Sequence, residues 1–159
     1  ADLPDTQKPA YGFDAPPKSV TLAPWPTVNP DHTDQALADA FEPYLQLRDT
    51  VHLALEPARK AGHIKSALAT DILLTTTNHV LNNADPDFLA SFLLVGQVVI
   101  NPTNTPAQVL GEMDHATVGK VQVLPASGQK CERCWNHRPS VGQHESALTL
   151  CTRCFKAIQ

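Results

Sequence analysis

The clearest periodic pattern of hydrophobic positions lies between residues 34 and 61, where apolar side chains recur at roughly helical spacing and predict a helix. Asp34 is suited to cap its first turn, and Gly62 is suited to end it. Pro43 and Pro57 interrupt the pattern, so we expect either one long, kinked helix or two helices, the second beginning near Pro43. The predicted apolar face comprises Leu37, Phe41, Leu45, Val51, Leu55 and Ala58.

Beyond Gly62 the pattern changes to short runs rich in β-branched and aliphatic residues, which is typical of strands. One short helix interrupts them from Asp85 to Phe92, with Asp85 as its N-cap and Pro86 as its first residue. We predict a loop at residues 101–106 and a linker at residues 125–128. The predicted strands are 69–77, 95–100 and 120–124.

The first 30 residues differ from the rest because they hold seven of the fourteen prolines. Proline fixes φ and lacks a backbone donor, so we predict an extended segment there, with a short strand at 19–22 and Trp25 as an apolar anchor. The whole chain is therefore expected to have an α+β fold. Its predicted parts are the extended segment (1–30), a long helix packed with a small sheet-and-helix subdomain (31–128), and a cysteine module (129–159).

Composition is that of a globular protein, because 42% of the 159 residues are apolar and 18% are charged. No apolar run approaches the roughly 18–20 residues that span a bilayer, and the longest, Phe92–Ile100, has only the length of a strand. The N-terminus has neither the basic stretch nor the apolar stretch of a signal peptide. We therefore expect a cytoplasmic protein with no membrane partner.

Charge is distributed unevenly along the chain. Residues 130–159 contain five Lys or Arg and two Glu, a net charge of 5 − 2 = +3. The whole chain carries −4, which leaves −4 − 3 = −7 for the remainder. Unless this clustering is chance, a basic end on an acidic body indicates contact with a polyanion.

The four cysteines lie between residues 131 and 154, with the spacing Cys-x2-Cys-x16-Cys-x2-Cys that is typical of a zinc ribbon or finger. Two residues between the members of a pair let both thiolates face one tetrahedral ion. Gly142 can turn a hairpin between the two pairs. We predict that one structural Zn²⁺ is held by Cys131, Cys134, Cys151 and Cys154. Nearby cations partly offset the −2 charge of a zinc tetrathiolate: Lys130, Arg133, Arg153 and Lys156.

Other interpretations of the cysteines fit less well. Disulfides form in an oxidising compartment, and the sequence shows no signal peptide that would direct the chain to one. A catalytic redox pair would need only one pair of cysteines, whereas this chain has two. Iron could occupy the same cage. His137 and His144 could act as ligands in a mixed site, but four cysteines already complete a tetrahedron, so we expect surface histidines.

No catalytic site is evident in the sequence. A closed four-cysteine site has no open coordination position and therefore does not catalyse. The chain contains no phosphate-binding glycine-rich loop, no Gly-x-Ser-x-Gly and no His-Glu-x-x-His. These absences favour a binding module over an enzyme.

Several segments together carry a family resemblance. Residues 130–135 read Lys-Cys-Glu-Arg-Cys-Trp and residues 150–154 read Leu-Cys-Thr-Arg-Cys. Four further segments lie upstream. Residues 18–26 read Lys-Ser-Val-Thr-Leu-Ala-Pro-Trp-Pro, two helical segments follow at Leu47–Val51 and Leu55–Arg59, and a turn at 64–68 reads Ile-Lys-Ser-Ala-Leu. In this order, from about Leu3 to Ile158, the chain resembles the C-terminal region of bacterial-type isoleucyl-tRNA synthetases, which comprises the end of the anticodon-binding domain and a zinc-binding module.

The resemblance implies a role without catalysis. The family consists of class I ligases that attach isoleucine to its tRNA with ATP, and their catalytic and editing domains do not fit in 159 residues. His63-Ile-Lys-Ser66 lacks the Gly and the second His of the family's His-Ile-Gly-His signature, and there is no Lys-Met-Ser-Lys-Ser loop. The implied protein is a C-terminal piece of the enzyme or a detached relative, partnered by the remaining synthetase domains, that binds the anticodon region of isoleucine tRNA.

Unpaired RNA bases are recognised by stacking on aromatic rings and by hydrogen bonds from Arg. Trp135 and Arg133 supply these groups in the cysteine module, and Lys130 and Arg138 are further candidate RNA contacts. Each of the first two also has a structural interpretation, because Trp135 could pack over the zinc site and Arg133 could balance the thiolates.

Two other functions remain open. DNA glycosylases of the formamidopyrimidine type end in a closely similar zinc module, but they use an N-terminal Pro-Glu pair where this chain has Ala1-Asp2. They also need a longer chain. The third possibility is a stand-alone zinc-ribbon interaction protein.

Overall fold

The computed structural model describes residues 19, 21, 29–104 and 106–159. The chain divides into two compact units, residues 1–38 and 39–159. In the first unit, the described part contains the 3₁₀ turn η3 (Pro30–His32) and the start of a long helix. Within residues 19–25, where a strand and the Trp25 anchor were expected, only Ser19 and Thr21 are described, and neither lies in a strand. Trp25 lies outside the described residues.

The long helix α1 (Gln35–Lys60) is continuous, so the alternative of two helices is wrong even though Pro43 and Pro57 lie inside it. Asp34 caps the helix as predicted, because its side chain accepts a hydrogen bond from the backbone N–H of Leu37 at 2.9 Å. The predicted C-terminal stop is confirmed at Gly62, whose φ of +75° is the left-handed conformation common after a helix.

The buried face of α1 begins later than predicted. Leu37 and Phe41 are 55% and 38% exposed. From Leu47 onward each buried position has another three or four residues further along or back, which is the pattern of one helix face. They are Leu47, Thr50, Val51, Ala54, Leu55 and Ala58.

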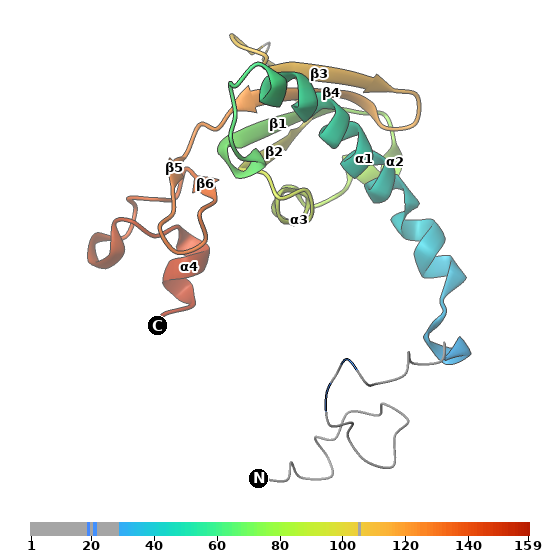
Figure 1. Cartoon of the computed structure of the whole chain (residues 1–159), viewed down its shortest axis with the longest axis horizontal. Coiled ribbons are helices and arrows are strands. Elements are labelled where there is room, and N and C mark those ends of the chain that lie inside the picture. Colours follow the sequence, from blue (N-terminus) through green and yellow to red (C-terminus); the bar gives the residue numbers. More distant parts are fainter. Residues whose placement is uncertain (1–18, 20, 22–28, 105) are drawn as a thin grey trace. The chain divides into compact units, whose positions relative to one another are not determined.

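A four-stranded sheet with the order β2-β1-β4-β3 lies beside α1 (Figure 1). β1 pairs in parallel with β2 and antiparallel with β4, which also pairs antiparallel with β3. The three predicted strands are confirmed as β1, β2 and β4, but β3 was not predicted. The strands are β1 (Thr70–Thr75), β2 (Gln97–Ile100), β3 (Gly111–His115) and β4 (Gly119–Pro125).

Two short helices connect β1 to β2, as a parallel pair requires. α2 (His79–Asn82) was not predicted, whereas α3 (Pro86–Phe92) confirms the predicted helix. Its N-cap is Asp85, which accepts from the backbone N–H of Asp87 at 2.9 Å. The mixed content of helix and sheet confirms the α+β class.

We call residues 39–125 the body. Its core is one cluster of buried apolar side chains from α1, α2, α3, the sheet and the loops that join them. At Gly111 a side chain would overlap the carbonyl oxygen of Ala54, so α1 packs directly on β3 at that point. None of the helices within the described ranges combines the length and the apolarity needed to cross a bilayer.

The cysteine module has little regular structure. It contains β5 (Gln129–Lys130), β6 (His137–Arg138), the 3₁₀ turn η5 (Glu145–Ala147) and α4 (Thr152–Lys156). β5 and β6 pair around the first cysteine pair. Gly142 does occupy a turn, with φ +92°, but the segment between the two pairs continues into η5 and is not the hairpin that we expected.

Candidate metal centre and nucleic-acid interface

The first cysteine pair lies in a tight turn between β5 and β6. The N–H of Trp135 donates to the carbonyl of Cys131 at 2.8 Å, and the N–H of Cys131 donates to the carbonyl of Asn136 at 2.9 Å. Trp135 closes the turn in the left-handed region, with φ +62°, a conformation that costs a residue with a Cβ about 1–2 kcal/mol. The turn therefore holds Cys131 and Cys134 close together at the expense of local strain.

The second pair is placed by α4. Cys151 is the N-cap residue of this helix and Cys154 lies in its first turn, so the helix itself fixes their spacing. A backbone hydrogen bond from Glu132 to Thr149, at 3.1 Å, joins the two halves of the module. Pairs distant in sequence are thereby brought to one place.

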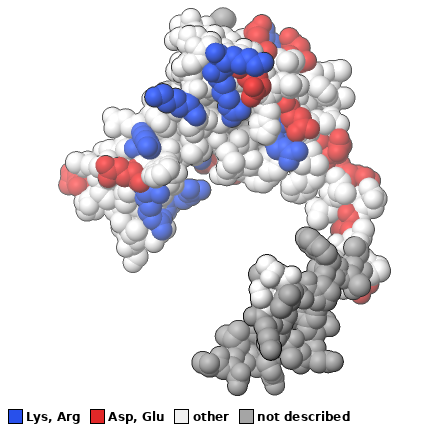
Figure 2. Space-filling model, in the orientation of Figure 1, with Lys and Arg blue, Asp and Glu red and all other residues white. Residues whose placement is uncertain are grey.

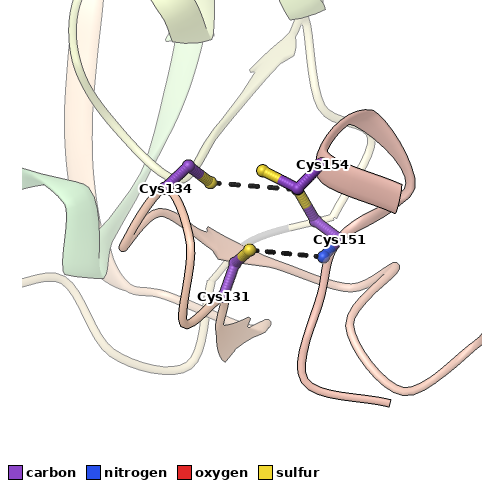
Figure 3. Close-up of side chains that lie close together, drawn as sticks. All are labelled: Cys131, Cys134, Cys151 and Cys154. Atoms are coloured by element: carbon purple, nitrogen blue, oxygen red, sulfur yellow. Dashed lines mark hydrogen bonds between the residues drawn. The ribbon is translucent and has the colours of Figure 1, made fainter. Parts of the chain in front are cut away.

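The four cysteine sulfurs converge in a single cluster (Figure 3). All four lie within 4.8 Å of one another, and the sulfurs of Cys134 and Cys151 are 3.8 Å apart. A tetrahedron with metal–sulfur bonds of about 2.3 Å has sulfur–sulfur edges of about 3.8 Å. The cluster thus has the dimensions of a tetrathiolate metal site.

Hydrogen bonds and burial act on the sulfurs in opposite directions. Burial raises the pKa of the Cys131 thiol, but backbone N–H donors of Cys134, Cys151 and Arg133 outweigh it and hold this pKa at about 6. One of these donors, the N–H of Cys151, lies 3.3 Å from the Cys131 sulfur. For Cys151 burial dominates and, with the neighbouring sulfurs, raises the pKa to about 12. The cluster therefore presents unlike thiols to a metal, one ionised readily and one only when a cation compensates.

Arg153 lies beside these sulfurs. Burial acts to lower its pKa, but the neighbouring Cys134 sulfur and the charges of the other thiolates raise it above the ordinary value. A guanidinium in this position stabilises the negative charge of a tetrathiolate, as the sequence suggested.

The two histidines of the module have other partners. His137 Nδ1 lies 3.2 Å from the carbonyl oxygen of Gly128. His144 stacks on Phe155 with ring centroids 4.0 Å apart, and its Nε2 lies 3.0 Å from the hydroxyl of Thr152. Both are half-buried rather than the surface residues that we expected, and the group of converging ligand atoms consists of the four cysteines.

The four candidate RNA contacts differ in how accessible they are. Trp135 is 63% exposed, and the Lys130 ammonium lies 5.0 Å from the centroid of its ring. Arg133 is exposed as well. Arg138, in contrast, forms an ion pair with Asp87 of α3 at 2.9 Å, and its side chain is only 16% exposed. The structure therefore groups Lys130 with Trp135 and directs Arg138 to a contact within the protein.

Sequence reasoning missed a groove beside Trp135. It has a volume of about 560 Å³ and runs between the segment from Gly62 to Ala69 and the first cysteine turn. Lys65 and Lys130 contribute its positive charge, and no Asp or Glu occurs among its described lining residues. The segment at 64–68 had been noted only for its family resemblance. Figure 2 shows acidic side chains along much of α1, and basic side chains both on the cysteine module, where acidic ones also lie, and on the body near the end of α1.

Comparison with known proteins identifies relatives over most of the chain. Residues 128–157 match a family model described as "Zinc finger found in FPG and IleRS". The chain is 36% identical over 143 residues to an isoleucine–tRNA ligase of Gloeobacter violaceus, which covers 88% of the chain and 14% of that ligase. The ligase of Moorella thermoacetica is 34% identical over 152 residues, covering 93% of the chain and 16% of the ligase.

A third ligase, from Staphylococcus aureus, is 34% identical over 146 residues, covering 89% of the chain and 15% of the ligase. The chain thus spans about one seventh of the length of these relatives. The resemblance noted in the sequence is confirmed, and the chain belongs with the isoleucyl-tRNA synthetases as the counterpart of their C-terminal, zinc-finger-bearing region.

Proposed function

We propose that this chain is a non-catalytic, tRNA-binding region of an isoleucyl-tRNA synthetase and that it binds the anticodon region of isoleucine tRNA. The observation that carries the proposal is the groove beside Trp135. It combines an exposed aromatic ring, two lysines and apolar walls, and its described lining has no carboxylate. Splayed RNA bases need an aromatic surface, and their phosphates need cations.

We propose Zn²⁺ as the metal of the four-cysteine cluster. Cys131, Cys134, Cys151 and Cys154 would hold it, and such a closed site supplies folding energy and no chemistry. Because the first pair lies in the turn that presents Trp135, the metal would hold the groove's aromatic side in place. Reduced thiolates require a reducing compartment, so we place the protein in the cytoplasm.

Within the groove the roles differ. Trp135 would stack on an unpaired base, while Lys130 and Lys65 would contact phosphates. Exposed Arg133 would read a base edge or contact a phosphate. Arg138 is already paired with Asp87, so we assign it a structural role. The remaining synthetase domains are the expected partners and would hold the rest of the tRNA. This chain alone should therefore bind the tRNA weakly.

The test compares Trp135→Ala with Leu148→Ala in filter binding to isoleucine tRNA. Leu148 is the matched control because it is an equally exposed apolar residue, at 59%, in the same module. Losing the stacking surface should cost about 1–3 kcal/mol of binding free energy, with the salt dependence unchanged. Lys130→Ala should instead flatten the plot of log affinity against log salt by about 0.7.

The metal content must remain unchanged in every variant for the comparison to count. If Trp135→Ala and Arg133→Ala leave the affinity for isoleucine tRNA and for its anticodon variants untouched, both in this chain and in a complete synthetase, the module is structural and the proposed function is wrong.

A second candidate function is DNA binding, as in the DNA glycosylases of the formamidopyrimidine type. One observation favours it, because the matching family model is named for FPG, which denotes these glycosylases, as well as for IleRS. In that case the groove would bind duplex DNA. Duplex DNA used as a competitor in the same assay separates the two functions, because it should displace isoleucine tRNA only if the glycosylase-like alternative holds.

A further inference from the structure

A buried carboxylate lies outside the groove, on the central strand β1. Asp71 is 6% exposed. Its Oδ2 accepts hydrogen bonds from the backbone N–H of Ser127 at 2.8 Å, from the Ser127 hydroxyl at 2.7 Å and from the Gln97 amide at 3.1 Å. Burying a carboxylate is costly unless donors compensate it, and here two of the three donors come from a single residue.

Ser127 belongs to the linker of residues 126–128, which connects β4 to β5. The linker is tied to the sheet by more than Asp71. The Gln97 amide also donates to the Ser127 hydroxyl at 2.8 Å, and the N–H of Ala126 donates to the carbonyl of Ala69 at 3.0 Å. The path from the body into the cysteine module is therefore fixed to β1 and β2 by a closed set of hydrogen bonds.

The cysteine module itself contacts the same end of the sheet. A Cβ on Gly96 would lie 2.7 Å from Asp71 Oδ1 and 3.2 Å from the carbonyl oxygen of His137. Gly96 thus allows the backbone of β6 and the side chain of Asp71 to approach the same point. The ion pair between Arg138 and Asp87, at 2.9 Å, adds a second attachment to α3.

The second oxygen of Asp71 has a different environment. Oδ1 is buried and has no hydrogen-bond partner in the described part of the chain. An unsatisfied buried oxygen is unfavourable and calls for an explanation. An apolar side chain would serve as well if Asp71 only occupied its place in β1. A clamp on Ser127, in contrast, needs an oxygen that accepts several hydrogen bonds, as Oδ2 does.

We propose that Asp71 is a positioning residue that fixes the orientation of the cysteine module by clamping Ser127. The clamp keeps Trp135 and Lys130 facing the segment from Gly62 to Ala69, so that the groove exists before RNA binds. Its consequence for tRNA rests on the proposed function, but the clamp itself does not.

The experiment measures ¹⁵N relaxation of the metal-loaded chain and of Asp71→Asn and Ser127→Ala. Asp114→Asn is the matched control, because it neutralises an exposed carboxylate on β3 of the same sheet. We expect the sheet and the cysteine module of the unmodified chain to share one rotational correlation time. Both clamp variants should shorten the value for the module alone, with metal stoichiometry unchanged, and should weaken tRNA binding roughly tenfold.

The result that overturns the clamp is a single shared correlation time in Asp71→Asn and Ser127→Ala. If Asp71→Asn does not fold, Ser127→Pro decides, because it removes both the backbone and the hydroxyl donor to Asp71 Oδ2 and Ser127 lies outside the strands. A failure of every form to bind tRNA would count against the proposed function, while the relaxation data would still decide whether the clamp exists. Faster tumbling in the Asp114→Asn control would also refute the specific role of Asp71.

Discussion

The body and the cysteine module are stabilised by different means. The described part of the body buries a single apolar cluster of seventeen residues, from Leu47 to Val123, drawn from helices, strands and the loops between them. The module buries four, and three of these are the cysteines Cys131, Cys151 and Cys154, with Val141 as the other. The cysteines that we propose as metal ligands thus take the place of an apolar core, so metal should determine the folding of the module and leave the body nearly unaffected.

The largest expected effect is that of metal removal. Chelation, or Cys131→Ser, should unfold the cysteine module while α1 and the sheet persist, because the two buried clusters are separate. The binding energy lost is of the order of 10–16 kcal/mol for a structural zinc site. Elemental analysis should give one zinc per chain, and ¹H–¹⁵N spectra should show only residues after the linker moving to unfolded positions.

Ser146→Ala is the control for this substitution, since Ser146 is exposed in the same module and should change neither metal content nor spectrum. Loss of the α1 and sheet signals together with those of the module would mean that the two regions fold as one unit, and the comparison would fail. Protein purified in reductant without chelator that contains no zinc would also contradict it.

The converse change acts on the body. Leu74 is fully buried on β1, between β2 and β4, so Leu74→Ala removes buried contacts and leaves a cavity. We expect the free energy of unfolding of the body to fall by about 2–5 kcal/mol, with zinc affinity unchanged. Urea denaturation followed by circular dichroism measures the first quantity and chelator competition the second; a variant that loses both would show that the module depends on the body's core.

Sequence reasoning succeeded where the structural signal is local. Two residues separate the cysteines of each pair, and this short spacing largely fixes how their sulfurs face one another. The cluster could therefore be predicted from the spacing. Asp34, Gly62 and Asp85 act within a few residues and were found as helix ends. The helical periodicity was also correct, although the buried face begins near Leu47 rather than Leu37, because periodicity gives the face of a helix and not the place where its partner begins.

Sequence reasoning failed where a feature depends on contacts between residues that are distant in the sequence. β3 reads Gly-Glu-Met-Asp-His, an edge strand with no fully buried residue, so its sequence lacks the apolar run typical of a strand. Nothing local indicates that Asp71 is buried or that Ser127 is its partner, 56 positions away. The groove was missed for the same reason, since the segment from Gly62 and the turn around Trp135 meet only in the folded protein.

A smaller effect concerns pH. With a pKa of about 6, Cys131 is largely ionised near neutral pH, whereas Cys151, with a pKa of about 12, must release its proton when metal binds. Zinc affinity should therefore rise with pH, by about tenfold or about 1.4 kcal/mol per unit for each proton released. Below about pH 6 Cys131 is protonated as well and releases one more proton on binding zinc, so the dependence should steepen.

Calorimetry of zinc binding in two buffers with different ionisation enthalpies counts these protons. At least one should be released per zinc at neutral pH. A zinc affinity that does not vary with pH would mean that the thiols are already ionised without metal, and would remove this distinction between the module and the body, whose stability should not follow the same curve.

The smallest effect is expected at the exposed edge of the body, in the ion pair of Glu112 on β3 with Lys120 on β4, 3.0 Å apart. The hydrogen bond to Lys120, aided by Gln122, lowers the pKa of Glu112, and Glu112 raises the pKa of Lys120. The lowered pKa of Glu112 stabilises the fold above the ordinary Glu pKa, and this stabilisation is lost as pH falls through the lowered value. The raised pKa of Lys120 stabilises the fold below the ordinary Lys pKa, and this stabilisation is lost as pH rises through the raised value.

Both side chains are open to solvent and screened, so Glu112→Gln should change the urea midpoint far less than Leu74→Ala at neutral pH. The remaining difference from the unmodified chain should vanish in strong acid and in concentrated salt, and should leave zinc affinity untouched. A midpoint shift as large as that of Leu74→Ala would show that this edge, and not only the buried cluster, holds the body together.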